Sequence, residues 1–305
     1  MIYLHNDKEQ FRDAIDLTYK QTGMMPQAIE KDYYVTMFLQ LLVQKISYIV
    51  FKGGTSLSKC YNVIQRFSED IDITIDINLS QGQKRKIKQS IVESAEELGM
   101  TIENLDATKS RRDYNAYKIA YDSVLSEKND ALKSAILLET SYTTVSFPTV
   151  VLPVDSYIGK MMQEEAPDRI EEYGLEPFQM KVQGMERTLV DKVFAICDYY
   201  LQKKVKGHSR HLYDIYKLLP LVSLDEKFKQ LVQEVREIRA KSVICPSAFP
   251  EVDVPELIEK IIEENAYKKD YYEIKTQLLA EELSYETAIG ALGQIVGSGM
   301  FKEHE

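Results

Sequence analysis

The sequence lacks the features that mark membrane-spanning and exported proteins. No apolar run reaches the roughly 18 residues that a membrane-spanning helix needs. The longest candidate, TMFLQLLVQKISYIVF, is interrupted by Gln40, Gln44 and Lys45. The N-terminus, MIYLHNDKEQ, has no basic segment followed by an apolar stretch, so no signal peptide is expected.

Cysteine is scarce, and basic residues are outnumbered. The three cysteines, Cys60, Cys197 and Cys245, lie far apart and form no C-x-x-C pair. This spacing predicts reduced thiols in a cytoplasmic protein, with neither a disulfide framework nor a zinc site. The net charge of -10 argues against a basic surface that binds duplexes indiscriminately. Basic residues still cluster locally, most densely between Lys203 and His211, where a solvated surface is the alternative interpretation.

The overall composition is that of a globular protein. The chain has 305 residues, of which 44% are hydrophobic and 28% are charged. This length supports a large core and suggests one or two domains.

Up to Gly99 the pattern alternates between helices and strands. Apolar spacing predicts two helices within residues 7–44, and ISYIVF predicts a short strand that ends at a glycine pair. The segment SLSKCYNVIQRF predicts a helix with Thr55 or Ser56 as its N-cap. The strict alternation of DIDITID predicts a strand, and QKRKIKQSIVESAEELG predicts an amphipathic helix that Gly99 stops.

The remainder of the chain divides into a strand-rich part and a helical part. Three strands are predicted between residues 101 and 154, in DYNAYKIAYD, SAILLETSY and FPTVVLPV. After about residue 180 the pattern is helical almost throughout. We therefore expect an α+β protein, in which a mixed β-sheet flanked by helices (residues 1–180) precedes a helical domain (residues 181–305).

Two aspartates on the DIDITID strand are candidate metal ligands. Alternation places Asp70, Asp72, Thr74 and Asp76 on one face, and the isoleucines from Ile71 to Ile77 on the other, buried face. Asp70 and Asp72 lie roughly 7 Å apart along the strand, whereas Asp76 is some 20 Å from Asp70 and too far to share a metal. Two such carboxylates can hold magnesium. The alternative is an acidic strand that is simply half exposed, although aspartate is depleted in strands.

Gly53, Gly54, Thr55 and Ser56 precede that strand and form a candidate phosphate-binding turn. Glycines allow the backbone to approach a ligand, the N–H groups at a helix start attract anions, and the two hydroxyls can add hydrogen bonds. A tight structural turn is the alternative, and the segment is not a Walker A loop. The order of strand, turn, helix and Asp-x-Asp strand favours the functional interpretation.

These residues carry a family resemblance. GG-[ST] followed by D-x-D is similar to the signature of the DNA polymerase beta-type nucleotidyltransferase superfamily. More closely, KGGTSLSK with SEDIDI, the upstream IEKDYYVT, and the later TLVDK and RHLYDIY resemble the AbiEii/AbiGii toxin nucleotidyltransferases. The resemblance spans roughly residues 25–220, with the motifs in the expected order.

The resemblance implies a role for each matching residue. Residues 53–56 would bind nucleotide phosphates, and Asp70 and Asp72 would hold a divalent metal. Lys192 would contact the nucleotide, and Asp214 matches the fourth motif's acidic residue. Arg210 would assist in nucleotide binding, although His211 departs from the family's usual pattern and leaves the roles of Arg210 and His211 open.

The residues of the later motifs also have ordinary interpretations. Lys192 edges an apolar helix face, where a lysine commonly extends its amine to solvent. Arg210 and Asp214 stand four residues apart, the spacing of a simple surface ion pair.

The superfamily resemblance further implies a third carboxylate that acts as general base. Glu139 is the candidate, because it stands in an otherwise apolar strand. The alternative is a glutamate that faces solvent. Lys31 and Lys59 lie near the motifs and are expected on helix surfaces, where a phosphate contact is an open alternative.

The implied activity is a Mg²⁺- or Mn²⁺-dependent transfer of a nucleotidyl group from a nucleoside triphosphate. The toxin resemblance implies an RNA acceptor, such as a tRNA 3′ end, and a cognate antitoxin protein, with the helical domain completing the cleft. Two alternatives stay open. One is a nucleotide-binding regulatory protein without turnover, and the other is a transferase that acts on a protein or a small molecule.

Overall fold

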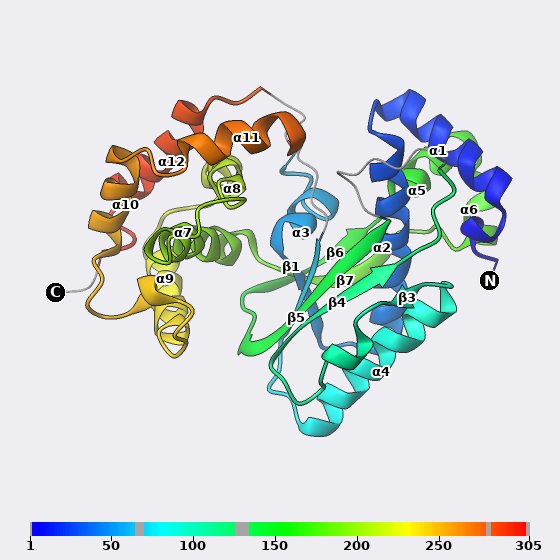
Figure 1. The fold of residues 1–305 in the computed structure, drawn as a ribbon, viewed down its shortest axis with the longest axis horizontal. Helices are drawn as coiled ribbons and strands as arrows, with labels where there is room; N and C mark the ends of the chain where they lie inside the picture. The colour runs from blue at the N-terminus through cyan, green and yellow to red at the C-terminus, as the bar shows by residue number, and fades with distance from the viewer. Residues whose placement is uncertain (1, 65–69, 126–133, 279–281, 303–305) are drawn as a thin grey trace. The chain divides into compact units, whose positions relative to one another are not determined.

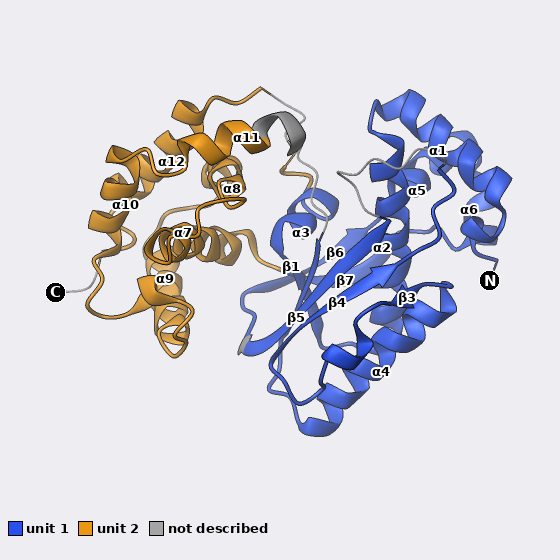
Figure 2. Ribbon diagram, viewed as in Figure 1, with its two compact units in different colours: residues 1–61, 69–182 blue, residues 62–68, 183–305 orange. Residues whose placement is uncertain are grey.

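The computed structural model describes residues 2–64, 70–125, 134–278 and 282–302 (Figure 1). The chain divides into two compact units, which Figure 2 shows in different colours. Residues 1–61 and 69–182 form the first unit, and residues 62–68 and 183–305 form the second.

The first unit is built on a mixed sheet, as expected. Its described strands pair in the order β3-β4-β5-β2-β1-β7-β6. Strand β2 is antiparallel to β1 and parallel to β5, and β1 is parallel to β7. The strands are β1 (Ile49–Lys52), β2 (Asp70–Ile75), β3 (Thr101–Ile102), β4 (Tyr114–Ala120), β5 (Ala135–Val145), β6 (Thr149–Val154) and β7 (Phe178–Gln183).

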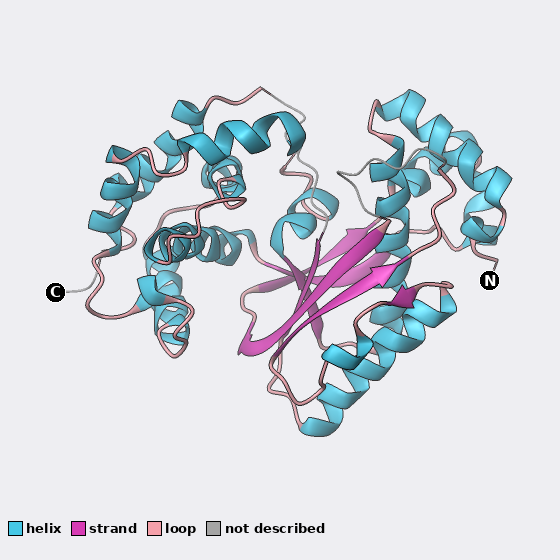
Figure 3. Cartoon of the chain, in the orientation of Figure 1, coloured by secondary structure: helices cyan, strands magenta, loops and turns pink. Residues whose placement is uncertain are grey.

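Helices flank this sheet, and Figure 3 shows them around the strands. The first unit contains α1 (Lys8–Thr22), α2 (Pro26–Lys45), α3 (Gly53–Lys59), α4 (Gln81–Glu97), α5 (Tyr157–Glu165) and α6 (Ile170–Tyr173), with short 3₁₀ turns η1 (Leu4–Asn6), η2 (Leu105–Ala107) and η3 (Pro167–Arg169). Phe38 of α2 and Ile87 of α4 share one apolar core with Ile71 and Ile73 of β2. One face of β2 is therefore committed to the core, which leaves the other face for polar residues.

Strand β2 follows the predicted alternation from Asp70 to Ile73, but Thr74, expected on the polar face, is buried, and the strand ends earlier than expected. Ile71, Ile73 and Ile75 are buried, whereas Ile77 lies beyond the strand and is 38% exposed. The prediction that Ile77 belongs to the buried face is therefore wrong. Asp76 also follows the strand, and its carboxylate accepts a hydrogen bond from Lys181.

Helix α3 differs most from its prediction. It begins at Gly53 with Lys52 as N-cap, so the expectation of Thr55 or Ser56 at that position is wrong. The helix ends at Lys59, and Asn62 adopts a φ of 54°. A right-handed helix cannot continue through such a residue. The last residues of the predicted helix, 65–67, lie outside the described part of the chain.

The second unit is helical, in agreement with the pattern after residue 180. It contains α7 (Met185–Leu201), α8 (Arg210–Leu218), α9 (Glu226–Arg239), α10 (Val254–Glu263), α11 (Lys268–Leu278) and α12 (Tyr285–Ser298), with 3₁₀ turns η4 (Leu219–Leu221) and η5 (Pro246–Ala248). Helix α8 packs against both α7 and α12. Within the described residues, no helix is both long enough and apolar enough to cross a membrane.

Candidate active site

Sheet register gathers the candidate carboxylates of the first unit into one row. Asp72 is paired with Lys52 on β1 and with Glu139 on β5, and Glu139 is paired with Ala116 on β4. Directly paired residues point to the same side of a sheet. Asp70 lies two residues before Asp72 and shares its face. The structure therefore brings Asp70, Asp72 and Glu139 together on the face opposite the isoleucine core.

Gly53 packs directly against this row. A Cβ atom on Gly53 would lie 2.8 Å from Cγ of Asp72 and would overlap its Oδ2. The φ angle of Gly53 is +79°, a conformation that side chains other than glycine rarely adopt. Both the space and the backbone therefore require glycine, and the turn approaches the carboxylate closely because Gly53 has no side chain.

The hydroxyls of the turn bind the backbone of the protein itself. Thr55 Oγ1 donates to the carbonyl oxygen of Asp70, and Ser56 Oγ donates to that of Gly53 at 2.9 Å. Both residues are buried, as is Gly54. The bond from Thr55 ties α3 to the start of β2, and the bond from Ser56 closes the first turn of α3 itself. The N–H groups of the first helical turn have no partners within their own helix, and they are the donors that a phosphate could engage here.

The carboxylates of Asp70, Asp72 and Glu139 are half-buried and lie close enough to repel one another. Burial raises the pKa of Glu139, and the nearby charges of Asp72 and Asp70 raise it further. A hydrogen bond from Tyr114 and the charge of Lys52 act in the opposite direction. Mutual repulsion of this kind is relieved by a bound cation.

Asp70 and Asp72 fit a magnesium ion as a pair of oxygen donors. Mg²⁺ is usually bound by one or two carboxylates, with waters and substrate phosphates as its remaining ligands. Among the described residues, no group of three or more His, Cys, Asp or Glu side chains is arranged to hold a metal. Within the described residues, Asp70 and Asp72 are therefore a pair of donors and not a closed cage of protein ligands.

Lys192 and Asp214 meet within the second unit. Lys192 Nζ on α7 lies 2.6 Å from Asp214 Oδ2 on α8, and the two side chains are 9% and 0% exposed. His211 Nδ1 lies 3.4 Å from Lys192 Nζ. The structure therefore differs from the two ordinary interpretations, because Lys192 does not extend to solvent and Asp214 pairs with Lys192.

Arg210 stands at the start of α8 and is half-buried. It follows the basic segment, in which Lys203, Lys204 and Lys206 are exposed. Burial lowers the pKa of His208, and the charge of Arg210 lowers it further. The second unit thus presents several cations over a short stretch of chain.

Lys31 and Lys59 were expected on helix surfaces, and the structure shows both to be buried. Lys59 forms an ion pair with Oδ1 of Asp32 on α2. Oδ2 of Asp32 accepts a 2.9 Å hydrogen bond from the backbone N–H of Tyr157, the first residue of α5. A single carboxylate therefore joins α2, α3 and α5, a role that sequence reasoning missed.

Tyr114 is a second residue that sequence reasoning missed. Its hydroxyl donates a 2.6 Å hydrogen bond to Oε1 of Glu139. Alternation within DYNAYKIAYD could have placed Tyr114 and Ala116 on one face. The sequence carries no signal for the register that sets this face beside Glu139.

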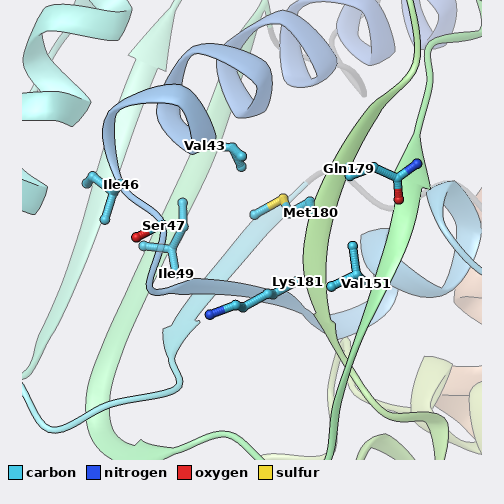
Figure 4. A pocket seen from close by; sticks show the side chains of 8 residues that line it. All are labelled: Val43, Ile46, Ser47, Ile49, Val151, Gln179, Met180 and Lys181. Atoms are coloured by element: carbon cyan, nitrogen blue, oxygen red, sulfur yellow. The ribbon is translucent and has the colours of Figure 1, made fainter.

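A small pocket lies elsewhere in the first unit. It is formed where α2 ends beside β6 and β7, as Figure 4 shows, and its described lining contains none of the predicted site residues. The lining consists of Val43, Ile46, Ser47, Ile49, Val151, Gln179, Met180 and Lys181.

Comparison with known families identifies the chain. Residues 38–291 match the family model described as nucleotidyl transferase AbiEii toxin, type IV TA system. The chain belongs to this family. The match extends through both compact units and includes the GGTS turn, the Asp-x-Asp strand, Lys192 and Asp214.

Comparison with solved structures gives the same fold. The chain is similar to MenT4, a nucleotidyltransferase toxin from Mycobacterium tuberculosis H37Rv, with a TM-score of 0.59 and 16% sequence identity. The alignment covers 95% of this chain and 90% of that one. A comparison with curated proteins gave no match.

The family membership establishes the class of activity. The AbiEii protein is a nucleotidyltransferase and the toxin of a type IV toxin–antitoxin system. Membership implies a nucleotide substrate and an antitoxin partner.

Proposed function

We propose that this AbiEii protein transfers a nucleoside monophosphate from a nucleoside triphosphate to RNA, with Mg²⁺ or Mn²⁺ as cofactor. A tRNA 3′ end is the specific acceptor in this proposal. The observation that carries it is the position of the Asp72 carboxylate, which lies against Gly53 on one side and is paired in register with Glu139 on the other. The turn that we propose to bind phosphate therefore adjoins the carboxylate that we propose to bind metal, and the candidate base Glu139 is paired with that carboxylate.

The roles of the first-unit residues follow from this arrangement. Asp70 and Asp72 would hold the divalent metal, which supplies charge neutralisation at the triphosphate when bound. The backbone of residues 53–56 binds phosphate oxygens. Glu139 accepts the proton of the acceptor hydroxyl, a task that its raised pKa suits because a stronger base holds the proton better.

The reaction balances with these groups. The acceptor oxygen forms a bond to the α-phosphorus in line, and the bond from that phosphorus to the bridging oxygen of the β-phosphate breaks. The proton of the hydroxyl goes to Glu139, and pyrophosphate leaves. Positioning and electrostatic stabilisation supply most of the catalysis in such phosphoryl and nucleotidyl transfers.

Lys192 and Asp214 act in the same reaction by resemblance to the family's third and fourth motifs. Lysine is a good point charge for phosphate oxygens. The buried carboxylate of Asp214, 2.6 Å from the ammonium of Lys192, would hold that ammonium in place. Arg210 adds a second cation for the nucleotide.

RNA is the proposed acceptor because a dense cluster of basic residues, Lys203 to His211, stands in a chain whose net charge is -10. Lys203, Lys204 and Lys206 are exposed and stand close in sequence to Arg210 and His211. Contacts of this type bind phosphate backbones and weaken as salt concentration rises. Transfer to RNA should therefore slow with added salt more steeply than nucleotide binding does.

The direct test incubates purified protein with magnesium, total RNA and each labelled nucleoside triphosphate in turn. We expect label on RNA, and loss of labelling in Asp70→Ala/Asp72→Ala or when a chelator removes the metal. The matched control is Asp13→Ala/Asp16→Ala, which removes two exposed carboxylates from α1 and should retain activity.

The same experiment separates the alternatives. Tight nucleotide binding by calorimetry with no product would indicate a regulatory protein without turnover. Label that appears only on another protein or a small molecule would replace RNA as the acceptor. Transfer that survives the Asp70/Asp72 double change would refute the proposed site.

A further inference from the structure

Tyr114 places a hydroxyl of the protein itself against the candidate base. The ring lies on β4, on the same face of the sheet as Glu139, and its hydroxyl donates to Oε1 of Glu139 at 2.6 Å. Tyr114 is 52% exposed, so a packed core does not hold the ring in place. The sheet therefore presents a reactive group type, a phenol, at the edge of the carboxylate row.

This position is the one that an acceptor hydroxyl needs. In the proposed reaction the acceptor must donate its proton to Glu139 while its oxygen faces the phosphate held beside Asp72 and Asp70. Tyr114 already makes that hydrogen bond. Burial and the bond to Glu139 raise the pKa of the Tyr114 phenol, and the charges of Asp72 and Asp70 raise it further, so the phenol keeps its proton until a base removes it.

We propose that Tyr114 is an internal acceptor, to which the protein transfers a nucleoside monophosphate from its own substrate. This inference rests on the proposed function. The Tyr114 oxygen bonds to the α-phosphorus, the bond from that phosphorus to the β-phosphate oxygen breaks, pyrophosphate leaves and the phenolic proton passes to Glu139. The co-reactant is the nucleoside triphosphate itself.

Transfer to Tyr114 would lower the rate of transfer to external acceptors. The product is a phosphodiester on Tyr114, which has no proton left to donate to Glu139 and leaves a nucleotide where an external acceptor must enter. Each chain therefore accepts one nucleotide at this position. Transfer to external acceptors should fall in proportion as self-modification accumulates.

The experiment uses the full chain with magnesium and each labelled nucleoside triphosphate, in two parallel reactions with and without total RNA. Intact mass gives the number of nucleotides per chain, and peptide mass spectrometry gives the modified residue. We expect one nucleotide on the peptide that contains Tyr114, at a rate per chain that does not depend on protein concentration. Glu139→Gln should slow self-labelling by about 100-fold, as is typical when a general base is removed.

Matched variants locate the acceptor. Tyr114→Phe should lose the label, whereas Tyr19→Phe should keep it, because Tyr19 is a tyrosine of similar exposure (47%) on α1 of the same unit. Asp70→Asn, which disables the proposed metal site, should abolish labelling of both the chain and RNA.

The possible outcomes separate this inference from the function on which it rests. Labelled RNA with an unlabelled chain would overturn the self-acceptor role and leave the proposed function standing. A label on another residue, or a rate that grows with protein concentration, would also overturn it. If neither RNA nor chain is labelled with any nucleotide, both proposals are wrong.

Discussion

At Gly53 even a methyl group has no room, and the resulting prediction is direct. In Gly53→Ala the new Cβ overlaps the Asp72 carboxylate, and the φ of +79° becomes strained. We expect the free energy of unfolding to fall by about 2 kcal/mol. Displacement of Asp72 should lower nucleotide transfer by about 100-fold, as misplacement by an ångström commonly does. Urea unfolding and initial rates of transfer measure the two effects.

Gly99→Ala is the control for backbone strain alone. Gly99 has a φ of +64°, but no atom lies within 4 Å of its added Cβ. It should lose about 1 kcal/mol of stability and keep its activity. Equal activity in the two variants would show that the contact between Gly53 and Asp72 does not position the carboxylate.

Variants of the Lys192–Asp214 pair can separate its contribution to the free energy of unfolding from its contribution to nucleotide transfer. Breaking a buried ion pair by changing one partner costs about 3–5 kcal/mol, because the other charge stays buried. Lys192→Met and Asp214→Leu should each be destabilised to this degree, and the double variant should be more stable than either. The double variant should still lack transferase activity, because it lacks the Lys192 ammonium that we propose to bind phosphate.

Denaturant melts of the four proteins in this cycle, with transfer assays beside them, provide the measurement. A stable double variant with normal activity would assign the pair to folding alone. Additive losses of stability would show that the two side chains do not interact energetically.

For single residues, the sequence predicts which side chains are polar and share a face better than it predicts which residues are in contact. Alternation in DIDITID correctly separates the isoleucines within β2 from Asp70 and Asp72, because side-chain period is a local property. The pairing of Asp72 with Glu139 depends on register between strands that are 67 positions apart. No local pattern encodes that register, and for the same reason Tyr114 was missed.

At the level of helices and strands, the position of α3 depends on Asp32, a residue of α2. Asp32 joins the buried Lys59 to α2 and receives the N–H of Tyr157 at the start of α5. Asp32→Asn leaves the ammonium of Lys59 without its counter-charge, so we expect a loss of about 3 kcal/mol. Because α3 begins with the turn that we propose to bind phosphate, the KM for nucleotide should rise.

Asp32→Asn/Lys59→Met is the matched test, since it removes the buried charge that Asp32→Asn leaves unpaired. Thermal unfolding should show recovery of much of the lost stability in this double variant. A KM that stays normal in Asp32→Asn would show that the turn does not depend on this link.

The contact between η1 and α2 predicts a pH dependence. Burial lowers the pKa of His5 from 6.5 to about 4, and its Nδ1 lies 2.9 Å from the hydroxyl of Tyr33. The unfolded chain therefore binds a proton more readily than the folded chain between pH 6.5 and pH 4. The contribution of neutral His5 to stability is complete above pH 6.5 and is lost as the pH falls through this window; the full pKa difference corresponds to about 3 kcal/mol, and solvent screening of the part-exposed imidazole reduces this figure.

Chemical denaturation at several pH values measures this slope. His5→Gln cannot titrate, so its stability should change less between pH 7 and pH 4.5 than that of the unchanged protein. Equal slopes would place the acid sensitivity elsewhere.

The boundaries of α3 and α4 show where local sequence preferences predict a helix end correctly and where they do not. The N-cap prediction for α3 followed the preference of Thr and Ser for that position. The helix begins earlier because Gly53 turns the chain directly after β1, which places both hydroxyls inside the helix, where they bond to backbone carbonyls. The stop of α4 before Gly99 was predictable, since a left-handed glycine there ends a helix by a local rule.

At the scale of the whole molecule, composition and periodicity suffice for the class of fold. A strand-rich part followed by a helical part was predicted, and the chain has a mixed sheet with flanking helices and then a run of helices. The strand order was not predictable, because β1 lies between β2 and β7, which are far apart in the chain. Within the described chain, residues 62–64 are grouped with the helical unit, although they lie within the sequence of the first unit.

The three cysteines allow the rates of local unfolding to be measured in the unmodified chain. Cys60 follows α3 directly in the first unit, and Cys197 lies in α7 of the second; both are buried. Burial raises the pKa of Cys60 to about 12 and raises that of Cys197, so each thiol stays protonated and reacts with an alkylating reagent only when its surroundings open. Cys245 is half-buried and should react first.

Timed alkylation followed by mass spectrometry would therefore record two opening rates without any substitution, in a chain that has no tryptophan to report them. A nucleoside triphosphate with magnesium should slow the labelling of Cys60, because a ligand bound at the turn must leave before α3 can open. Cys245 serves as the internal standard for reagent strength. Unchanged protection of Cys60 at saturating nucleotide would show that the turn opens with its ligand still in place.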